Sequence, residues 1–382
     1  MMKRYIALGL FAALLFGVSC KKDSVNPKDE EEVRDPDKET LLRDSTYFYS
    51  LLFSLWEDKL PQPKADSNGD ADLKAFTGAY ETSEEVLGAL REYATDDRFS
   101  FVDRAGTVSE EIQQGIYKET GITPIYISFT DGTTTETNLY VKLVQKDSPA
   151  DKAGFKRGMK ITSINGDTKL DYDTDEKQDF KNFYRVMTGE GAMEMVVQAA
   201  GESKTQNLTV TAAAYNVDPI LINKTFRVND KKVGYLFYTS FVNVMSSSGP
   251  NAYYTDLLNA FKEFETENID ELVVDLRYNG GGSTNTADFL ANLIAPTDVG
   301  NGKMYDYKIN KHLKENGWDD DANPDAPFSS VYFDKPNSLN LSRVYFLGTT
   351  STASASELVM NVLKPYMDVE IITTNGQGTY GK

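Results

Sequence analysis

The stretch that decides the fold lies near the end of the chain and reads Arg343-Val-Tyr-Phe-Leu347, Gly348-Thr-Thr-Ser-Thr-Ala-Ser-Ala-Ser-Glu357, then Leu358 to Lys364. The first part is a short apolar, β-prone run, which is typical of a buried strand. In the last part apolar residues recur at helical spacing, and Pro365 predicts that this helix ends at Lys364. The sequence therefore predicts a strand, a tight loop rich in hydroxyl side chains, and a helix.

Ser354 is expected at the start of this helix, where free N–H groups and the positive end of the helix dipole meet. An attacking serine needs that field, because negative charge builds on its oxygen and on the carbonyl that it attacks. However, Ser354-Ala-Ser-Glu357 also fits the capping box S-x-x-E, in which the serine only caps the helix. Capping is the commoner explanation for the motif alone. Two other stretches favour catalysis, Asp275-Leu-Arg-Tyr-Asn-Gly-Gly-Gly282 and Tyr380-Gly381-Lys382.

The three glycines Gly280-Gly-Gly282 follow the apolar run Leu272–Leu276 and precede a predicted helix over residues 286–294. Backbone N–H groups of a loop between a strand and a helix commonly face a ligand. The pattern is not G-x-G-x-x-G and no G-K-[ST] follows, so it argues against a nucleotide site. An oxyanion hole built from backbone N–H groups is the remaining interpretation.

A serine nucleophile needs a base, and the chain has one histidine, His312. It lies in a polar stretch without a motif, and we expect it to be a solvated loop residue. Lysine is the known alternative base, provided that burial lowers the pKa of its amine towards neutrality. Lys382 follows a glycine, which permits close approach; without the other motifs it would be interpreted as a surface lysine.

The beginning of the chain resembles a bacterial lipoprotein signal. Lys3 and Arg4 precede an apolar stretch over residues 6–18 that is too short to span a membrane, and Gly17-Val-Ser-Cys20 follows. We expect residues 1–19 to be a signal peptide, Cys20 to be lipidated and residues 20–38 to be a flexible tether. A plain secretory signal with a chance cysteine is the alternative.

The overall composition restricts the partners and cofactors. A net charge of −18 over 382 residues argues against nucleic acid as a partner. Because Cys20 is the only cysteine, neither an internal disulfide nor a cysteine-based zinc site is expected. No motif indicates another cofactor, and none is expected.

Residues 39–110 are predicted to be helical, and residues 111–213 to form strands joined by glycine turns. In the second region Ser148-Pro-Ala, Ala153-Gly154, Gly158-Met159 and Ile164-Asn-Gly166 resemble a PDZ domain of the circularly permuted bacterial type. Such a domain adds an extended peptide to a sheet edge, usually by its free C-terminus. Gly115-Ile116 and Gly121-Ile122 are both candidates for its carboxylate-binding loop. A small β domain that serves only as a spacer is the alternative.

Residues 214–382 show an α/β pattern and carry the most specific resemblance. Tyr235, the block over residues 275–282, Thr352-Ala-Ser-Ala-Ser-Glu357 and Gly381-Lys382 together resemble the C-terminal processing peptidases, which are tail-specific serine proteases of family S41. The resemblance extends from about Glu111 to Lys382. It implies a multidomain chain in which a helical segment and a permuted PDZ domain precede an α/β serine-protease core of the ClpP/crotonase-like type.

By this resemblance Ser354 is the nucleophile and Lys382 the general base. The implied oxyanion donors are N–H groups of Gly280 or Gly281 and of Ala355. The family usually continues past the lysine into a strand with a glutamine that orients it, so we expect this chain to be truncated at Lys382.

The implied function is a Ser-Lys serine endopeptidase held in the cell envelope by a lipid anchor. We expect it at the outer membrane facing the periplasm, or on the cell surface. Its expected partners are proteins with exposed C-termini, and a homo-oligomer is left open. Two alternatives stand beside this hypothesis: a catalytically inactive peptide-binding lipoprotein with a PDZ domain, and a hydrolase of a non-peptide acyl substrate.

Overall fold

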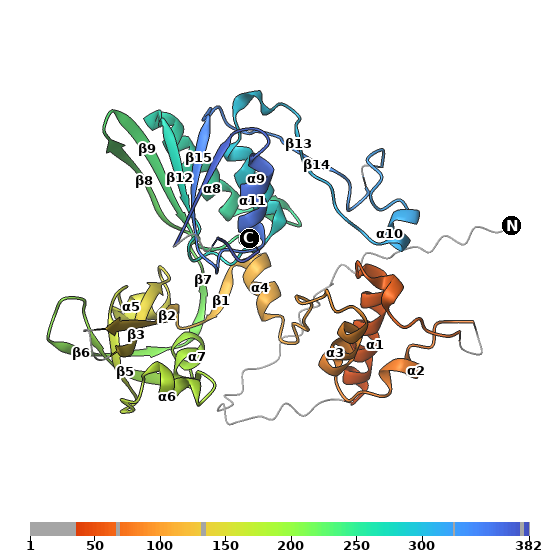
Figure 1. Cartoon of the computed structure of the whole chain (residues 1–382), viewed down its shortest axis with the longest axis horizontal. Helices are drawn as coiled ribbons and strands as arrows, with labels where there is room; N and C mark the ends of the chain where they lie inside the picture. Colours follow the sequence, from red (N-terminus) through yellow and green to blue (C-terminus); the bar gives the residue numbers. More distant parts are fainter. Residues whose placement is uncertain (1–35, 66–68, 131–134, 324, 375–377, 382) are drawn as a thin grey trace.

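The structure is a computed structural model that describes residues 36–65, 69–130, 135–323, 325–374 and 378–381. These residues form an upper α/β part, a β-rich part at the lower left and a helical part at the lower right of Figure 1. Cys20 and Lys382 lie outside the described residues. Among the described helices, none is both long and apolar enough to cross a bilayer.

The upper part, which we call the core, is built on a five-stranded sheet in the order β16-β15-β12-β9-β8. Only β8 runs antiparallel to its neighbour. The strands are β8 (Ile220–Val228), β9 (Lys231–Tyr238), β12 (Glu271–Asp275), β15 (Arg343–Gly348) and β16 (Asp368–Thr373). The strands predicted over residues 272–276 and 343–347 are thereby confirmed to within one residue.

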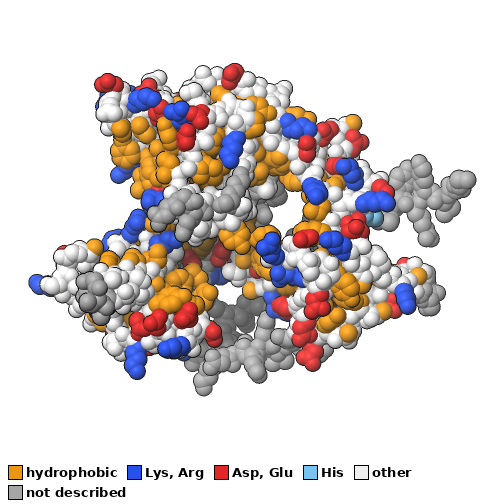
Figure 2. Space-filling view, in the orientation of Figure 1, with side chains coloured by type: hydrophobic (Ala, Val, Ile, Leu, Met, Phe, Trp, Pro, Cys, Tyr) orange, Lys and Arg blue, Asp and Glu red, His pale blue; other side chains and the backbone are white. Residues whose placement is uncertain are grey.

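Helices cover one face of the core sheet (Figure 1). They are α8 (Ala252–Glu267), α9 (Thr284–Ile294) and α11 (Ala355–Leu363). Val274 and Phe346, which pair in register, are fully buried beneath these helices. Val273 and Tyr345 alternate to the other face, where they line a shallow pocket with Val228. Figure 2 shows hydrophobic side chains gathered over these strands at the upper left.

The β-rich part is a five-stranded antiparallel sheet in the order β2-β3-β4-β5-β6, so β2 and β6 are its edges. Its elements are β2 (Ile122–Thr130), β3 (Thr135–Val144), α5 (Pro149–Ala153), β4 (Lys160–Ile164), α6 (Tyr172–Glu176), α7 (Lys181–Thr188), β5 (Ala192–Gln198) and β6 (Thr205–Thr211). Asn165 and Gly166 both have positive φ, as a tight turn requires, which confirms the predicted turn. Leu139, Val141 and Val197 belong to its buried core.

Two connections tie the parts together. A ribbon of β1 (Ile116–Glu119) and β7 (Ala213–Asn216) links the β-rich part to the core. An arm reaches from the core to the helical part (Figure 1); it contains β13 (Lys303–Tyr305), α10 (Lys311–Glu315) and β14 (Val331–Tyr332). Two short strands, β10 (Met245–Ser246) and β11 (Gly249–Pro250), and the 3-10 turn η2 (Thr297–Val299) complete the core.

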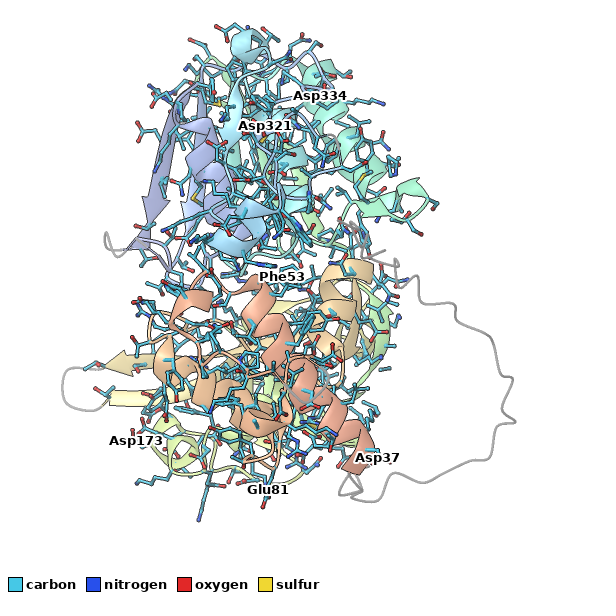
Figure 3. All side chains as sticks on the ribbon, turned by 90° about the vertical axis from the view of Figure 1, so that its right-hand side faces the viewer. Asp37, Phe53, Glu81, Asp173, Asp321 and Asp334 are labelled. Carbon is cyan, nitrogen blue, oxygen red and sulfur yellow. The ribbon has the colours of Figure 1, made fainter. Side chains whose placement is uncertain are left out.

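The arm binds the C-terminal end of the first helix of the chain by hydrogen bonds and a ring contact. Asn310 donates hydrogen bonds to the carbonyls of Leu52 and Ser54, at 2.9 and 3.0 Å. Phe53 packs edge-on against Trp318 of the arm, and it lies at the boundary between the lower helices and the upper part in Figure 3. His312 is exposed on this arm, within α10, so the prediction of a loop conformation was wrong although its exposure was expected.

The helical part contains α1 (Pro36–Phe53), η1 (Glu57–Lys59), α2 (Lys74–Thr77) and α3 (Ser83–Tyr93), and α4 (Thr107–Gln114) lies beside β1 (Figure 1). α1 begins inside the stretch expected to be a tether, and α4 runs across the expected boundary at residue 111. Thr82 and Glu85 form a complete capping box at the start of α3.

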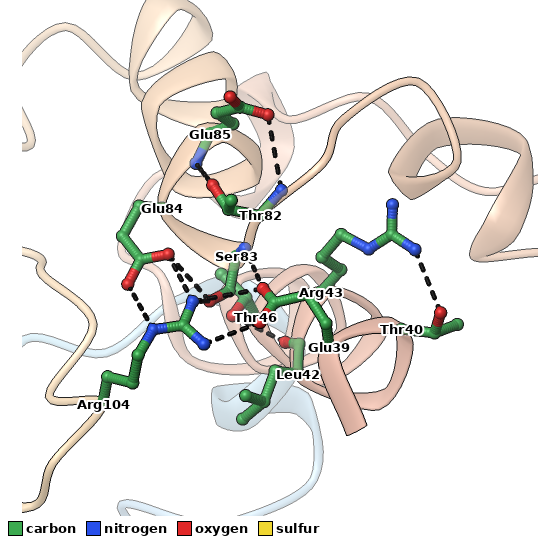
Figure 4. Close-up of polar contacts among 10 residues, drawn as sticks. All are labelled: Glu39, Thr40, Leu42, Arg43, Thr46, Thr82, Ser83, Glu84, Glu85 and Arg104. Carbon is green, nitrogen blue, oxygen red and sulfur yellow. Dashed lines mark hydrogen bonds and ion pairs between the residues drawn. The ribbon is translucent and has the colours of Figure 1, made fainter. Parts of the chain in front are cut away.

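One ion-pair network joins α1 to α3 (Figure 4). Arg104 contacts Glu39 at 2.6 Å and Glu84 at 2.5 Å, and it also donates to the Ser83 hydroxyl. Glu39 is 7% exposed and accepts the Ser83 N–H as well. Its hydrogen bond to Arg104 lowers the pKa of Glu39, and the same cation lowers the pKa of Glu84 to about 2.

We predict that Arg104→Met destabilises the packing of α1 on α3 by about 3 kcal/mol, because it leaves the buried Glu39 carboxylate without its cation. Since both carboxyl pKa values are lowered, the stabilisation is complete above their ordinary value of 4.5 and is lost as pH falls towards 2. Hydrogen exchange of the α3 amides would measure both effects. Lys59→Met, which breaks only the exposed pair with Asp96, serves as control and should cost under about 1 kcal/mol. Unchanged α3 protection in Arg104→Met would contradict the prediction.

Candidate active site

Parallel pairing brings two loops to one edge of the core sheet. β12 and β15 are neighbours, with Asp275 opposite Leu347, so the chain leaves both strands at the same end. The loop after β12 contains Gly280 to Gly282, and the loop after β15 leads to Ser354. The two stretches that the sequence singled out therefore meet outside the carboxyl ends of parallel strands, where ligands bind in open α/β sheets.

Side-chain and backbone hydrogen bonds lock these two loops together. The buried Thr352 hydroxyl donates to the Leu276 carbonyl at 2.8 Å, and the Thr349 hydroxyl donates to the Arg277 carbonyl at 2.9 Å. The Leu276 N–H donates to Leu347 O. Because these threonine hydroxyls of one loop donate hydrogen bonds to carbonyls of the other, neither loop can move far without breaking the bonds.

Asp275 anchors the beginning of the glycine loop. It is fully buried, and it accepts hydrogen bonds from Tyr235 at 2.6 Å and from the Arg277 guanidinium at 2.6 Å. Burial, with this hydrogen bond, raises the pKa of Tyr235 to about 12. The paired cation makes the burial of this carboxylate tolerable.

Ser354 occupies a strained turn at the N-terminus of α11. Its φ of 56° and ψ of −120° belong to a region that side-chain-bearing residues rarely adopt. The residue is exposed, and its hydroxyl forms no cap bond to the described part of α11. The capping interpretation of Ser354-Ala-Ser-Glu357 is therefore wrong.

Glu357, the other member of the expected capping box, binds the end of the described chain instead. One carboxylate oxygen accepts the Thr379 hydroxyl at 2.6 Å and the Gly381 N–H at 3.0 Å. The Tyr380 N–H donates to the Thr352 carbonyl at 3.0 Å. The segment immediately before Lys382 is thus held beside the N-terminus of α11.

The second serine of the motif is not accessible. Ser356 is fully buried, and its hydroxyl donates to the Asn279 carbonyl at 3.3 Å, which ties α11 to the glycine loop. Of the two serines, only Ser354 presents its hydroxyl to an incoming molecule.

The three expected oxyanion donors have different surroundings. The Gly281 N–H is occupied, because it donates to the Asn279 side-chain oxygen at 2.8 Å. The N–H groups of Gly280 and Ala355 have no partner among the described residues. A Cβ on Gly281 would lie 2.7 Å from Ser354 Cβ and 3.1 Å from Ala355 N, so only glycine permits the loop to approach the serine this closely. The geometry therefore leaves Gly280 and Ala355 as the candidate donors.

Sequence reasoning missed Thr352, Asn279 and Glu357 as residues that shape the site. Thr352 and Glu357 lie inside the quoted motif, and Asn279 lies inside the glycine block, so their positions were visible. Their roles depend on contacts across 22 or more residues of sequence, which no local pattern discloses.

We predict that Ser354→Gly has a higher thermal unfolding midpoint than Ser354→Ala, because glycine adopts the positive φ without strain of about 1–3 kcal/mol. Both variants lack the hydroxyl, so the comparison isolates the backbone. In the control pair, Ser356→Gly should melt below Ser356→Ala, since a glycine inside a helix costs about 1 kcal/mol relative to alanine. A Ser354→Gly midpoint at or below that of Ser354→Ala would show that the turn is unstrained.

The comparisons with known proteins agree with this geometry. Residues 232–382 match the sequence profile of Peptidase family S41. The carboxy-terminal processing protease CtpB of Bacillus subtilis (strain 168) is 24% identical over 246 residues, which is 61% of this chain and 43% of that protein. The chain thus spans less than half the length of this curated relative.

A solved structure from Bacteroides fragilis NCTC 9343, described as an S41 protease, shares the fold. It superposes with a TM-score of 0.60 at 24% identity, over 95% of this chain and 81% of that one. The matched family segment begins in β9 and contains both loops of the site. Residues 232–382, which contain β9, β12, β15 and β16, therefore match peptidase family S41.

Proposed function

We propose that the chain is a serine endopeptidase in which Ser354 is the nucleophile and Lys382 the general base. The observation that carries the proposal is the exposed Ser354, held in a strained turn between a helix N-terminus and a glycine loop. A strained, accessible residue whose surroundings fix its geometry is a common feature of active sites. The family match over residues 232–382 supports the same chemistry.

In the proposed reaction the Ser354 hydroxyl oxygen attacks the carbonyl carbon of the scissile peptide bond. The neutral amine of Lys382 takes the hydroxyl proton and later gives it to the leaving amine. The carbonyl oxygen becomes an oxyanion, which the N–H groups of Gly280 and Ala355 stabilise together with the positive end of α11. Water then attacks the acyl carbon while Lys382 takes its proton; the bond between the acyl carbon and Ser354 Oγ breaks, and Lys382 returns the proton to Oγ, which releases the new C-terminal carboxyl group.

The placement of Gly381 supports Lys382 as the base. Glu357 accepts the Gly381 N–H, so the residue that precedes Lys382 in the sequence lies beside the N-terminus of α11. The side chain of Lys382 lies outside the described residues. The only histidine is exposed on the arm, which makes a histidine base the weaker hypothesis.

For substrate capture we propose that the β-rich part is a PDZ domain that binds exposed protein C-termini. Its edge strand β2 lies beside α7, where an added peptide strand would pair with β2. Gly121-Ile122 begins this free edge, whereas Gly115-Ile116 begins β1, which is paired with β7. This difference favours Gly121-Ile122 as the carboxylate-binding loop.

We also propose that Cys20 is lipidated and anchors the protein in the cell envelope, with residues 20–35 as tether. The proposal rests on the sequence pattern of the leader, since these residues lie outside the described part of the chain.

We predict that Ser354→Ala abolishes cleavage of an unfolded protein such as casein, because the nucleophile is gone, while far-ultraviolet circular dichroism stays unchanged. Ser356→Ala removes only the hydrogen bond to Asn279 O and should lower kcat/KM by about tenfold or less. Appearance of cleaved casein fragments measures both. An active Ser354→Ala chain together with an inactive Ser356→Ala chain would assign the reaction to the other serine.

We predict that activity rises with pH, because a protonated Lys382 cannot accept the serine proton. Lys382→Met should remove the activity, whereas His312→Ala should leave both the rate and the pH profile unchanged. The pH profile of kcat/KM in the three proteins is the measurement. Loss of activity in His312→Ala would replace the lysine mechanism by a histidine mechanism.

A further inference from the structure

A cleft of about 430 Å³ lies between the β-rich part and the loops of the candidate active site. From the core it is lined by Tyr278 and by Thr349 to Ser351, which belong to the same two loops as Gly280 and Ser354. From the β-rich part it is lined by Ile125, Lys142 and Arg157. Its volume lies within the range of small-molecule and side-chain pockets.

Two cations converge on this cleft. The ammonium of Lys142 lies 4.5 Å from the centre of the Tyr278 ring, and the guanidinium of Arg157 lies 5.6 Å from it. A third cation, Arg277, lies 5.9 Å from the same ring, but its charge is paired with Asp275. The aromatic ring therefore gathers positive charge beside the glycine loop.

Neither Lys142 nor Arg157 forms an ion pair with a carboxylate of the described chain. This is notable in a protein whose net charge is −18. Burial and the neighbouring Arg157 lower the pKa of Lys142, so the ammonium is held where its charge is poorly compensated. A bound anion would offset both the burial of the Lys142 ammonium and its repulsion by Arg157.

The cleft is distinct from the groove proposed for the PDZ domain. Leu139 and Val141 of β3 pack into the buried core of the β-rich sheet, on the side of its helices, whereas Lys142 alternates to the opposite face. The two sites therefore lie mainly on opposite faces of the sheet and share the edge strand β2, whose Ile125 lines the cleft.

We propose that this cleft is a subsite for a carboxylate of the polypeptide substrate, bound by Lys142 and Arg157 next to the scissile bond. The proposal rests on the proposed peptidase function and adds a charge preference to it. Thr350 and Ser351, which also line the cleft, carry hydroxyls that can donate further hydrogen bonds. The carboxylate is either the terminal α-carboxylate or an Asp or Glu side chain, and the experiment separates these two sources.

The test uses the full chain with Ser354→Ala, so that bound peptide is not cleaved. Three fluorescein-labelled apolar decapeptides share one sequence: one has a free C-terminus, one is amidated, and one is amidated with a glutamate near its end. Fluorescence anisotropy gives the affinity of each. Adding Lys142→Met and Arg157→Met should weaken binding of a carboxylate peptide by about tenfold or more and leave the plain amidated peptide unchanged.

Two control variants make the result specific. Lys152→Met with Lys169→Met removes two exposed cations from the same part of the chain, outside the cleft, and should leave all affinities unchanged. Lys142→Arg keeps the charge and should retain binding. A loss confined to the free-acid peptide assigns the subsite to the terminal carboxylate, and an equal loss for the glutamate peptide assigns it to acidic side chains.

Affinities of both carboxylate peptides that do not depend on Lys142 and Arg157 would overturn the subsite. The parent chain with Ser354 intact is assayed in parallel for cleavage of the same peptides. Absence of cleavage with the expected binding pattern would overturn the proposed peptidase function while supporting the subsite. Cleavage without the binding pattern would support the proposed peptidase function and overturn the subsite.

Discussion

The contact on which the site depends is the close approach of Gly281 to Ser354. It exists because β12 and β15 are parallel neighbours, so the loops that follow them leave the sheet side by side. Any side chain at position 281 would meet Ser354 Cβ at 2.7 Å, and the threonine bonds from Thr349 and Thr352 hold the two loops in this arrangement. The strained backbone of Ser354 persists because its neighbours over-determine it. Accessibility of the hydroxyl and strain of the turn are consequences of the same packing.

The polar residues around this contact bind some backbone groups of the two loops and leave other backbone N–H groups without a partner in the described chain. Asn279 uses its side chain to occupy the Gly281 N–H and to bind the Tyr238 carbonyl. Ser356 binds the Asn279 backbone carbonyl. These bonds fix the shape of the loop, and they leave the N–H groups of Gly280 and Ala355 without a partner in the described chain. Free donors at a helix N-terminus are stabilised by ligands or water, and the proposed reaction assigns them to the oxyanion.

The sequence predicted the order of the core elements well because buried strands and capped helices leave strong local patterns. The run over residues 343–347 and the helix after it appear where hydrophobic periodicity indicated them. The S-x-x-E pattern covers only four residues and suggested a capping role for Glu357. Its carboxylate instead binds a segment 22 or more residues away. The tether was expected to end at residue 38, whereas α1 begins at Pro36; Glu39 in its first turn binds Arg104 across 65 residues of sequence, a contact that no local pattern discloses. The roles of Cys20 and Lys382 stay predictions.

The arm and the cleft each join parts of the molecule by a few contacts, and the β1–β7 ribbon adds a small buried cluster of Tyr215, Val217 and Val242. The arm contributes one aromatic pair and two hydrogen bonds to α1, and the cleft contributes cation–π contacts to Tyr278. Each such contact is worth about 0.5–1.5 kcal/mol, against about 5–15 kcal/mol for the stability of a folded domain. The geometry of Ser354 and of the free Gly280 and Ala355 N–H groups is set by the core sheet and by the two loops that follow β12 and β15. Displacement of the β-rich part would therefore change the cleft around Lys142 and Arg157 first, and leave Ser354 and these N–H groups in place.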